Sequence, residues 1–360
     1  MSAFKTRILA VTAGLLLAAG QASADGTAAG TAVTNQATVD YAVGVVNQPD
    51  VNSNTSSFVV DRRVLVTVAE VGNAYTDVTP GAAAQVLTFT VTNDTNATMD
   101  FRLDVAQDTT STADPFGGTD DFDATGPIAY LDVNDDGLYD AGDTQTFLDE
   151  IAADDTVTVF VVSDIPFGQA NGNSASLTLT AIAAEAGAAG IGADSVQTAG
   201  AEDPDQIDIV FGDIAGDTDG ARDGRHSDDD AYRIQTATIV VTKTSTVISD
   251  PFNITSNPKR IPGAVVEYCI TVENTGDAAA TAVVVNDVLA GQPVTYQTGS
   301  LFTVDTGADC TGGDAEDDGA TGTDETDPNG ASESGGTVTA TFQTLPALGG
   351  KAMRFRVTID

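Results

Sequence analysis

The chain has 360 residues and a formal net charge of −39, with 53 Asp and Glu against 14 Lys and Arg. Because phosphates are bound through Lys and Arg, this balance argues against nucleic acid and anionic lipid as partners. Self-repulsion on this scale destabilises a compact state unless salt or divalent cations screen it. Trp is absent and 6% of residues are aromatic, which counts against the aromatic clefts of many enzymes and carbohydrate-binding modules.

The first residues read as a secretory signal peptide. A positively charged start precedes the apolar run 8–20, and Ala22 and Ala24 are the small residues that a signal peptidase reads. The run is shorter than the ~20 residues that span a bilayer. We predict a signal peptide at 1–24, cleavage before Asp25, and a mature chain without membrane insertion. It would be secreted, extracellular or at the cell surface, with the periplasm as an alternative.

Strand alternation in runs rich in Val, Thr and Ile fills most of the remaining chain, between clusters of Gly, Asp and Asn. Many short strands between turn signals indicate an all-β chain of tandem immunoglobulin-like β-sandwiches with long acidic loops. The predicted divisions are an N-terminal hairpin or arm at 25–60, a first β-sandwich at 61–190, an acidic Gly/Asp-rich linker or loop at 191–235 with one short strand at 207–211, and a second β-sandwich at 236–360.

An internal repeat supports two similar sandwiches. "PGAAAQVLTFTVTNDTNATMDFRL" begins at Pro80 and "PGAVVEYCITVENTGDAAATAVVV" begins at Pro262. Each places an alternating strand after a Pro-Gly turn and before a polar turn. When the strands are aligned, Asn93 matches Asn274.

The second copy resembles a known family, the domain of unknown function eleven, a β-sandwich module repeated in bacterial surface and secreted proteins. The residues that fit the family pattern are Pro262, Gly263, Asn274, Thr275, Gly276 and Asp287. The resemblance covers about 237–360 with a long acidic loop inserted, and 61–190 is a divergent copy that has "TNDTN" in place of Asn-Thr-Gly. It implies a surface or matrix role and supplies no catalytic residues.

The stretch "DVNDDGLYDAGD" has the ligand spacing of a twelve-residue calcium loop. Positions one, three, five, seven, nine and twelve are Asp132, Asn134, Asp136, Leu138, Asp140 and Asp143. Leu138 would offer its backbone carbonyl, Gly137 stands at the sharp turn, and Asp143 replaces the usual Glu. The flanks look like strands, so we expect a strand–loop–strand calcium site. The alternative is a solvated Asp-Gly turn.

Two further acidic stretches are weaker candidates. In "DTDGARDGRHSDDD", Asp217, Asp219 and Asp223 suggest a similar loop, but the later ligands are out of register. His226, the single histidine, is expected to be a satisfied or solvated loop residue. "DAEDDGATGTDETDPNG" is expected to be a solvated loop.

Cys269 and Cys310 are the two cysteines of the chain, and export favours a disulfide between them. Alternation predicts that Cys269 faces outward with Glu267 and Thr271. The bond would attach the start of the acidic loop to the outer face of a strand.

These features favour a secreted, non-enzymatic structural or adhesive protein of the bacterial surface or extracellular matrix, stabilised by calcium. Its expected partners are other surface or matrix proteins or further copies of itself. One alternative is a filament subunit that donates the strand "GTAVTNQATVDYAV" to a neighbour. Another is a carbohydrate-binding module or a hydrolase, although no nucleophile, zinc or phosphate-loop motif occurs in the sequence.

Overall fold

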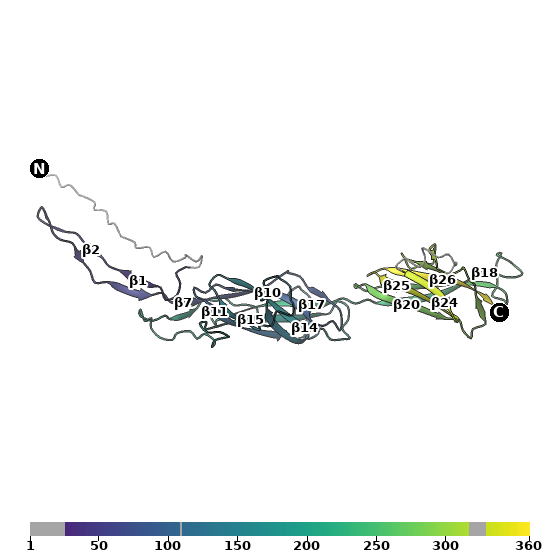
Figure 1. Cartoon of the computed structure of the whole chain (residues 1–360), viewed down its shortest axis with the longest axis horizontal. Helices are drawn as coiled ribbons and strands as arrows, with labels where there is room; N and C mark the ends of the chain where they lie inside the picture. The colour runs from purple at the N-terminus through teal and green to yellow at the C-terminus, as the bar shows by residue number, and fades with distance from the viewer. Residues whose placement is uncertain (1–25, 109, 317–328) are drawn as a thin grey trace.

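The computed structural model describes residues 26–108, 110–316 and 329–360, and the predicted signal peptide lies outside them. Within these ranges every regular element is a β-strand, which confirms the all-β class. Buried apolar residues form two separate cores, one drawn from residues 64–234 and the other from 266–357. Figure 1 shows a hairpin, a first sandwich and a second sandwich following one another along the length of the molecule.

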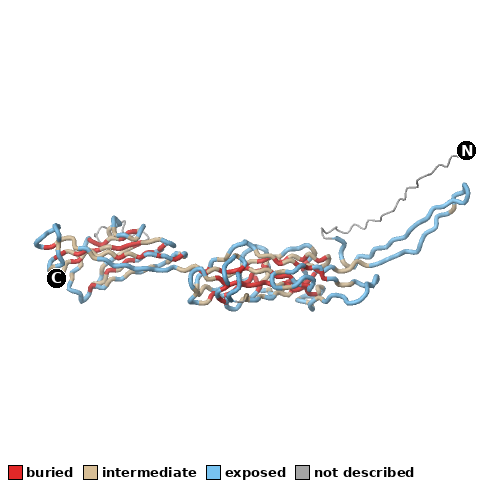
Figure 2. The backbone as a smooth tube through the Cα atoms, turned by 180° about the vertical axis from the view of Figure 1, so that it is seen from behind, coloured by how far each residue is buried: buried red, intermediate tan, exposed pale blue. Residues whose placement is uncertain are grey.

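The hairpin at residues 32–59 projects from the first sandwich (Figure 1). Its paired strands are β1 (Ala32–Asn35) with β6 (Ser56–Val59), β2 (Thr38–Val39) with β5 (Val51–Asn52), and β3 (Ala42–Val43) with β4 (Val46–Asn47). Gly44, with a φ of +64°, turns the chain at the tip. Nearly all of this segment is exposed (Figure 2). We call it the arm.

The first sandwich packs a four-stranded sheet, ordered β12-β14-β10-β8, on a five-stranded sheet, ordered β13-β11-β15-β17-β9. Their bounds are β8 (Val66–Glu70), β9 (Thr76–Val78), β10 (Gln85–Asn93), β11 (Met99–Gln107), β12 (Thr125–Leu131), β13 (Phe147–Ile151), β14 (Thr156–Asp164), β15 (Ser174–Ala184) and β17 (Arg225–Ile234). Along β10, Leu87, Phe89 and Val91 are buried while the threonines between them are half-buried. This alternation directs one face of each strand to the core.

The second sandwich packs a sheet ordered β18-β19-β26-β22-β23, with β21 also on β26, against a sheet ordered β20-β25-β24. Their bounds are β18 (Ile239–Ser249), β19 (Val265–Asn274), β20 (Ala280–Val288), β21 (Val294–Tyr296), β22 (Phe302–Val304), β23 (Asp314–Ala315), β24 (Asn329–Ser334), β25 (Thr337–Leu345) and β26 (Gly350–Ile359). Phe342 and Phe355 are fully buried between the two sheets.

The segment 191–235 differs from the expected linker or loop. Its short strand β16 (Ile209–Phe211) pairs in parallel with β7 (Arg62–Val64) at the root of the arm. Its end forms β17, which lies between β15 and β9 in the five-stranded sheet. Three consecutive Asp residues in β17 hid its strand character, because two inward positions that are usually apolar are occupied by acids.

The inward polar side chains of β17 close the edge of the opposite sheet. His226 Nδ1 accepts the backbone N–H of Val68 at 3.1 Å, and Asp228 Oδ2 accepts that of Glu70 at 2.6 Å. His226 is therefore a buried, satisfied residue of a strand and does not lie in a loop. Occupied donors make this edge less available for pairing with another chain.

Asn93 and Asn274, matched in the sequence repeat, have the same structural role. Both are buried, at 0% and 1% exposure. Each side-chain amide donates to the carbonyl four residues ahead, at 2.9 Å and 2.7 Å, and to a carbonyl of the opposite sheet, at position 151 for Asn93 and 345 for Asn274. Each amide oxygen accepts a backbone N–H two residues ahead. One side chain thus fixes the turn after the strand and joins it to the other sheet.

Replacing Asn274 by Ala should lower the free energy of unfolding of the second sandwich by about 3 kcal/mol, because several buried backbone groups lose their partner together. Urea unfolding measures the change. Asn286→Ala, at an exposed position of β20, is the matched control and should cost less than about 0.5 kcal/mol. Equal effects of the two substitutions would contradict the assigned role.

Candidate functional site

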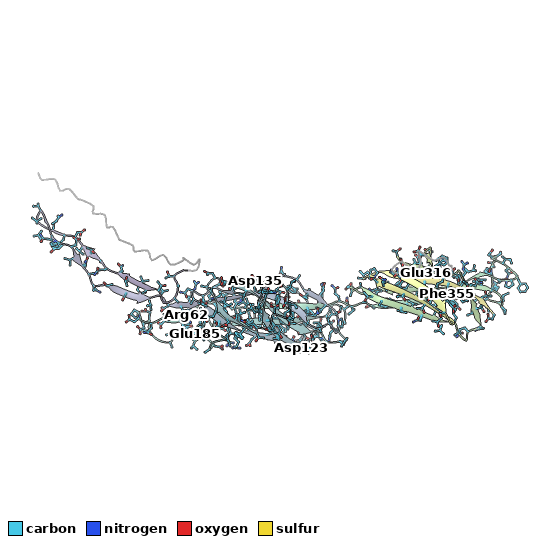
Figure 3. All side chains as sticks on the ribbon, in the orientation of Figure 1. Arg62, Asp123, Asp135, Glu185, Glu316 and Phe355 are labelled. Atoms are coloured by element: carbon cyan, nitrogen blue, oxygen red, sulfur yellow. A yellow bond between two sulfur atoms is a disulfide. The ribbon has the colours of Figure 1, made fainter. Side chains whose placement is uncertain are left out.

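The calcium-type loop lies between β12 and β13, which confirms the strand–loop–strand arrangement. Because β12 and β13 belong to different sheets, the loop crosses from one sheet to the other. Tyr139 anchors its middle, with ring centroids 5.6 Å from Tyr130 and 6.1 Å from Phe160. Asp135, at position four of the loop, is labelled in Figure 3.

The two end positions of the loop are buried acids that hold its backbone. Asp132 and Asp143 are 6% and 2% exposed. Asp132 Oδ2 accepts the N–H of Gly137 at 2.8 Å. Asp143 accepts the N–H groups of Val133 and Asp140, both at 2.9 Å. These contacts turn both carboxylates toward the inside of the loop.

The remaining side-chain ligand positions converge on the same interior. Asn134 Nδ2 donates to Asp136 at 3.0 Å and to Asp140 at 3.4 Å. Gly137 has a φ of +76°, which permits the sharp turn that a wrapping loop requires. The Leu138 side chain is 70% exposed, so this position would contribute through its carbonyl alone. Such a set of hard oxygens suits calcium, which takes six to eight oxygen ligands at about 2.4 Å.

A second acidic group was not foreseen from the sequence. Among residues 26–108, 110–316 and 329–360, one group of three acids has ligand oxygens all within 4.8 Å of one another, and it consists of Asp100, Asp149 and Glu150. A register shift between β11 and β13 and a φ of +56° at Glu150 bring them together. Fully buried Asp100 accepts the N–H groups of Glu150 and Gly192, at 2.8 and 3.0 Å. Spacing along the chain gave no sign of this bulge.

The three acids of the stretch around Asp217 make different contacts. Asp219 accepts the hydroxyl of Ser227 in β17, and Asp223 accepts the backbone N–H of Arg225 at 3.2 Å. Asp217 instead lines a separate recess of about 390 Å³ with Asp108 and Asp229. Burial, followed by the charges of Asp217 and Asp108, raises the pKa of Asp229 to about 6.

Asp230 is the most perturbed carboxyl group of this region. It is 2% exposed, and burial is the main reason why its pKa is raised to about 7 from the ordinary 3.8, although the N–H of Ala231 opposes the shift. At a pH low enough for an acid to be neutral in both the folded and the unfolded state, its raised folded-state pKa does not change the free energy of unfolding. As pH rises from about 4 to about 7, the unfolded state ionises first and the folded state becomes less stable.

Asp230→Asn should therefore stabilise the first sandwich by about 2–4 kcal/mol at pH 8 and have little effect at pH 4. The amide can still accept the bond from Ala231, so the local structure is kept. Unfolding in urea at the two pH values measures the difference. Asp205→Asn, an exposed site, serves as the control. A gain of equal size at both pH values would show that ionisation is not its cause.

The predicted disulfide is present. Cys269 in β19 is bonded to Cys310, with Cα atoms 5.9 Å apart. Cys269 lies opposite Arg354 on the outer face of the sheet, where Glu267 accepts a hydrogen bond from Arg356 at 2.9 Å. The bond joins β19 to the loop that follows β22. Most of the third acidic stretch lies outside the described residues, because 317–328 are not described.

The root of the arm is tied to the first sandwich by an ion pair. Arg62 Nη1 lies 2.5 Å from Glu185 Oε2, and both residues are labelled in Figure 3. Burial opposes ionisation of Glu185, but hydrogen bonds from Ser195 and Arg62 outweigh it and lower the pKa of this carboxyl group. The first residues of the sandwich are thus held at the point from which the arm projects.

Comparison with known proteins gives little further information. No family model and no curated protein matches the chain. A solved structure, the "Putative membrane anchored protein from Corynebacterium diphtheriae", aligns over 91% of this chain and 89% of its own, with 11% identity and a TM-score of 0.19. A TM-score this low supports no inference. No helix long and apolar enough to cross a membrane occurs among the described residues.

Proposed function

We propose that the chain is a secreted, non-enzymatic structural or adhesive protein of the bacterial cell surface or extracellular matrix. The observation that carries this proposal is the extended architecture, in which an exposed arm and two β-sandwiches follow one another (Figure 1). The signal-peptide pattern and the resemblance of 237–360 to the domain of unknown function eleven add support. An elongated chain of rigid modules suits a role of spanning or linking.

Calcium is the proposed cofactor of the loop at 132–143. The oxygens of Asp132, Asn134, Asp136, Asp140 and Asp143, with the carbonyl of Leu138, would hold the ion. A divalent cation would fix the crossing between the two sheets of the first sandwich. It would also neutralise part of the high negative charge.

An export assay tests the proposed location. Expressed in a bacterial host, the chain should lose residues 1–24 and be recovered, starting at Asp25, from the cell surface or the medium. Mass spectrometry of the fractions identifies the new N-terminus. Ala24→Arg should block processing, whereas Ser23→Gln, at the unread position between the two small residues, should not. An unprocessed chain confined to the cytoplasm would overturn the proposal.

A filament subunit is the second candidate, and the uncovered arm favours it. A long exposed hairpin can complete the sheet of a neighbour through backbone hydrogen bonds. Electron microscopy of the purified protein with calcium tests it. Monomers alone at high concentration would count against it.

A further inference from the structure

The arm carries exposed apolar side chains at its root, middle and tip. Three cross-strand pairs place two apolar side chains directly opposite each other, so that each pair shares a face. The pairs are Val33–Phe58, Val39–Val51 and Val43–Val46. These six side chains are between 36% and 64% exposed. Val33 and Phe58 line a recess with Arg63 and Asn96 at the root of the arm, whereas the four valines nearer the tip are each more than half exposed. An isolated two-stranded hairpin is marginally stable in water, so these exposed valines call for a partner surface.

The second sandwich has a free sheet edge that also carries exposed apolar side chains. β18 is the end strand of its sheet and pairs with β19 alone. Ile239 and Val241 lie opposite buried Asn274 and Val272, so their side chains point toward the inner face. They are nevertheless 40% and 57% exposed. At this edge the inner surface of the sheet is therefore exposed and is not covered by the opposite sheet.

The backbone of β18 is also available for pairing. Arg260 Nη2 donates to the carbonyl of Ser245 at 3.0 Å, which shows that this carbonyl points away from β19. Backbone groups repeat their direction every second residue along a strand. The N–H and C=O groups of Lys243, Val241 and Ile239 therefore also face the free edge.

Three sheet edges of the first sandwich are less suited to receive a strand. The donors of β8 are occupied by side chains of β17. β13 carries the bulge at Glu150, and β9 has three residues. β18, with 11 residues, is the longest end strand among the described sheets. Its length suits the Ala32–Val43 side of the arm.

Charge also favours contact between these two surfaces. Residues 32–59 contain two acidic residues, Asp40 and Asp50, in a chain with 53. Lys243 lies in β18, and Arg260 lies against its free edge. The arm can therefore approach this edge with little of the self-repulsion that separates the rest of the surface.

We infer that the Ala32–Val43 strand of one copy adds to the free edge of β18 in a second copy, with Val39 of the arm extending the inner surface formed by Ile239 and Val241. This inference rests on the proposed structural role and identifies the two surfaces that would form the contact between copies. The arm and β18 lie on different parts of one chain (Figure 1). Such a heterologous contact repeats into an open assembly unless its rotation closes a ring.

Light scattering of the mature chain over a concentration series tests the contact. The wild type should form species of at least twice the monomer mass, and Val39→Lys and Val241→Lys should each reduce the mass to that of the monomer. Thr38→Lys and Val240→Lys, which place the same charge on the opposite faces, are the matched controls and should still assemble. Far-UV circular dichroism checks that every variant remains folded.

A mixing experiment identifies the partner surface. Chains carrying Val39→Cys are mixed with chains carrying Val241→Cys, and disulfides between unlike chains should exceed those between like chains by about tenfold. Cross-links mainly between two arms, or assembly that survives Val241→Lys, would overturn the assignment of β18. A wild-type monomer at every concentration would overturn self-association altogether. Neither result affects the export experiment, so failure of the contact is distinguishable from failure of the proposed location.

Discussion

Removing calcium should lower the melting temperature of the first sandwich by roughly 5–10 °C. At a free calcium concentration of 100 times the Kd, binding contributes about 2.7 kcal/mol. Each kcal/mol corresponds to about 2–4 °C for a unit of this size. Differential scanning calorimetry with calcium and with a chelator measures the shift. The second sandwich has its own core and should melt unchanged.

Variants assign this effect to the loop at 132–143. Asp132→Asn with Asp143→Asn should abolish the calcium-dependent shift, because both buried charges are lost while acceptors for the backbone remain. Asp135→Asn is the control, since this residue is not a ligand and its φ of +55° is well tolerated by Asn. A full shift in the double variant would place the ion elsewhere, for example at the group around Asp100.

Replacing Cys269 and Cys310 by Ser should lower the free energy of unfolding of the second sandwich by roughly 4 kcal/mol. The bond closes a loop with a sequence separation of 41 residues, and the chain-entropy model assigns about this value to such a loop. Urea unfolding of the double variant, compared with the wild type with and without reductant, measures the loss.

The first sandwich provides an internal control for the disulfide experiment. Its transition should not move, because its core lies in residues 64–234 and contains neither cysteine. Reduced wild type and the double variant should agree, since both lack the same covalent constraint. A loss below about 1 kcal/mol would show that the unfolded chain gains little freedom when the bond is absent.

The parts of the fold that follow local patterns were predictable from the sequence. The alternation of β10 and β19, the strands on either side of the calcium-type loop and the cysteine pair are all found in the structure. The repeat correctly paired Asn93 with Asn274, although it did not reveal why an Asn is required. That reason lies in carbonyls about 60 to 70 residues away in the chain.

The features that depend on tertiary contacts were not predictable. β17 resembled an acidic loop because His226 and Asp228 face inward to satisfy an edge strand, a role that no local pattern shows. The group of Asp100, Asp149 and Glu150 depends on a bulge and on a residue with positive φ. The exposure of Ile239 and Val241 also depends on tertiary structure, because it is set by how far the opposite sheet extends over them.

The strand order of the second sandwich determines how it would respond to mechanical load. β18 and β26 both run antiparallel to β19, so they run parallel to each other on its two sides. The chain therefore enters the sandwich at Ile239, and the end of β26 at Ile359 lies at the opposite end of the sheet. Tension along the molecule would pull these strands lengthwise past β19 and load many backbone hydrogen bonds at once. Hydrogen bonds arranged in this way resist rupture together, whereas a hairpin pulled open from one end loses them one by one.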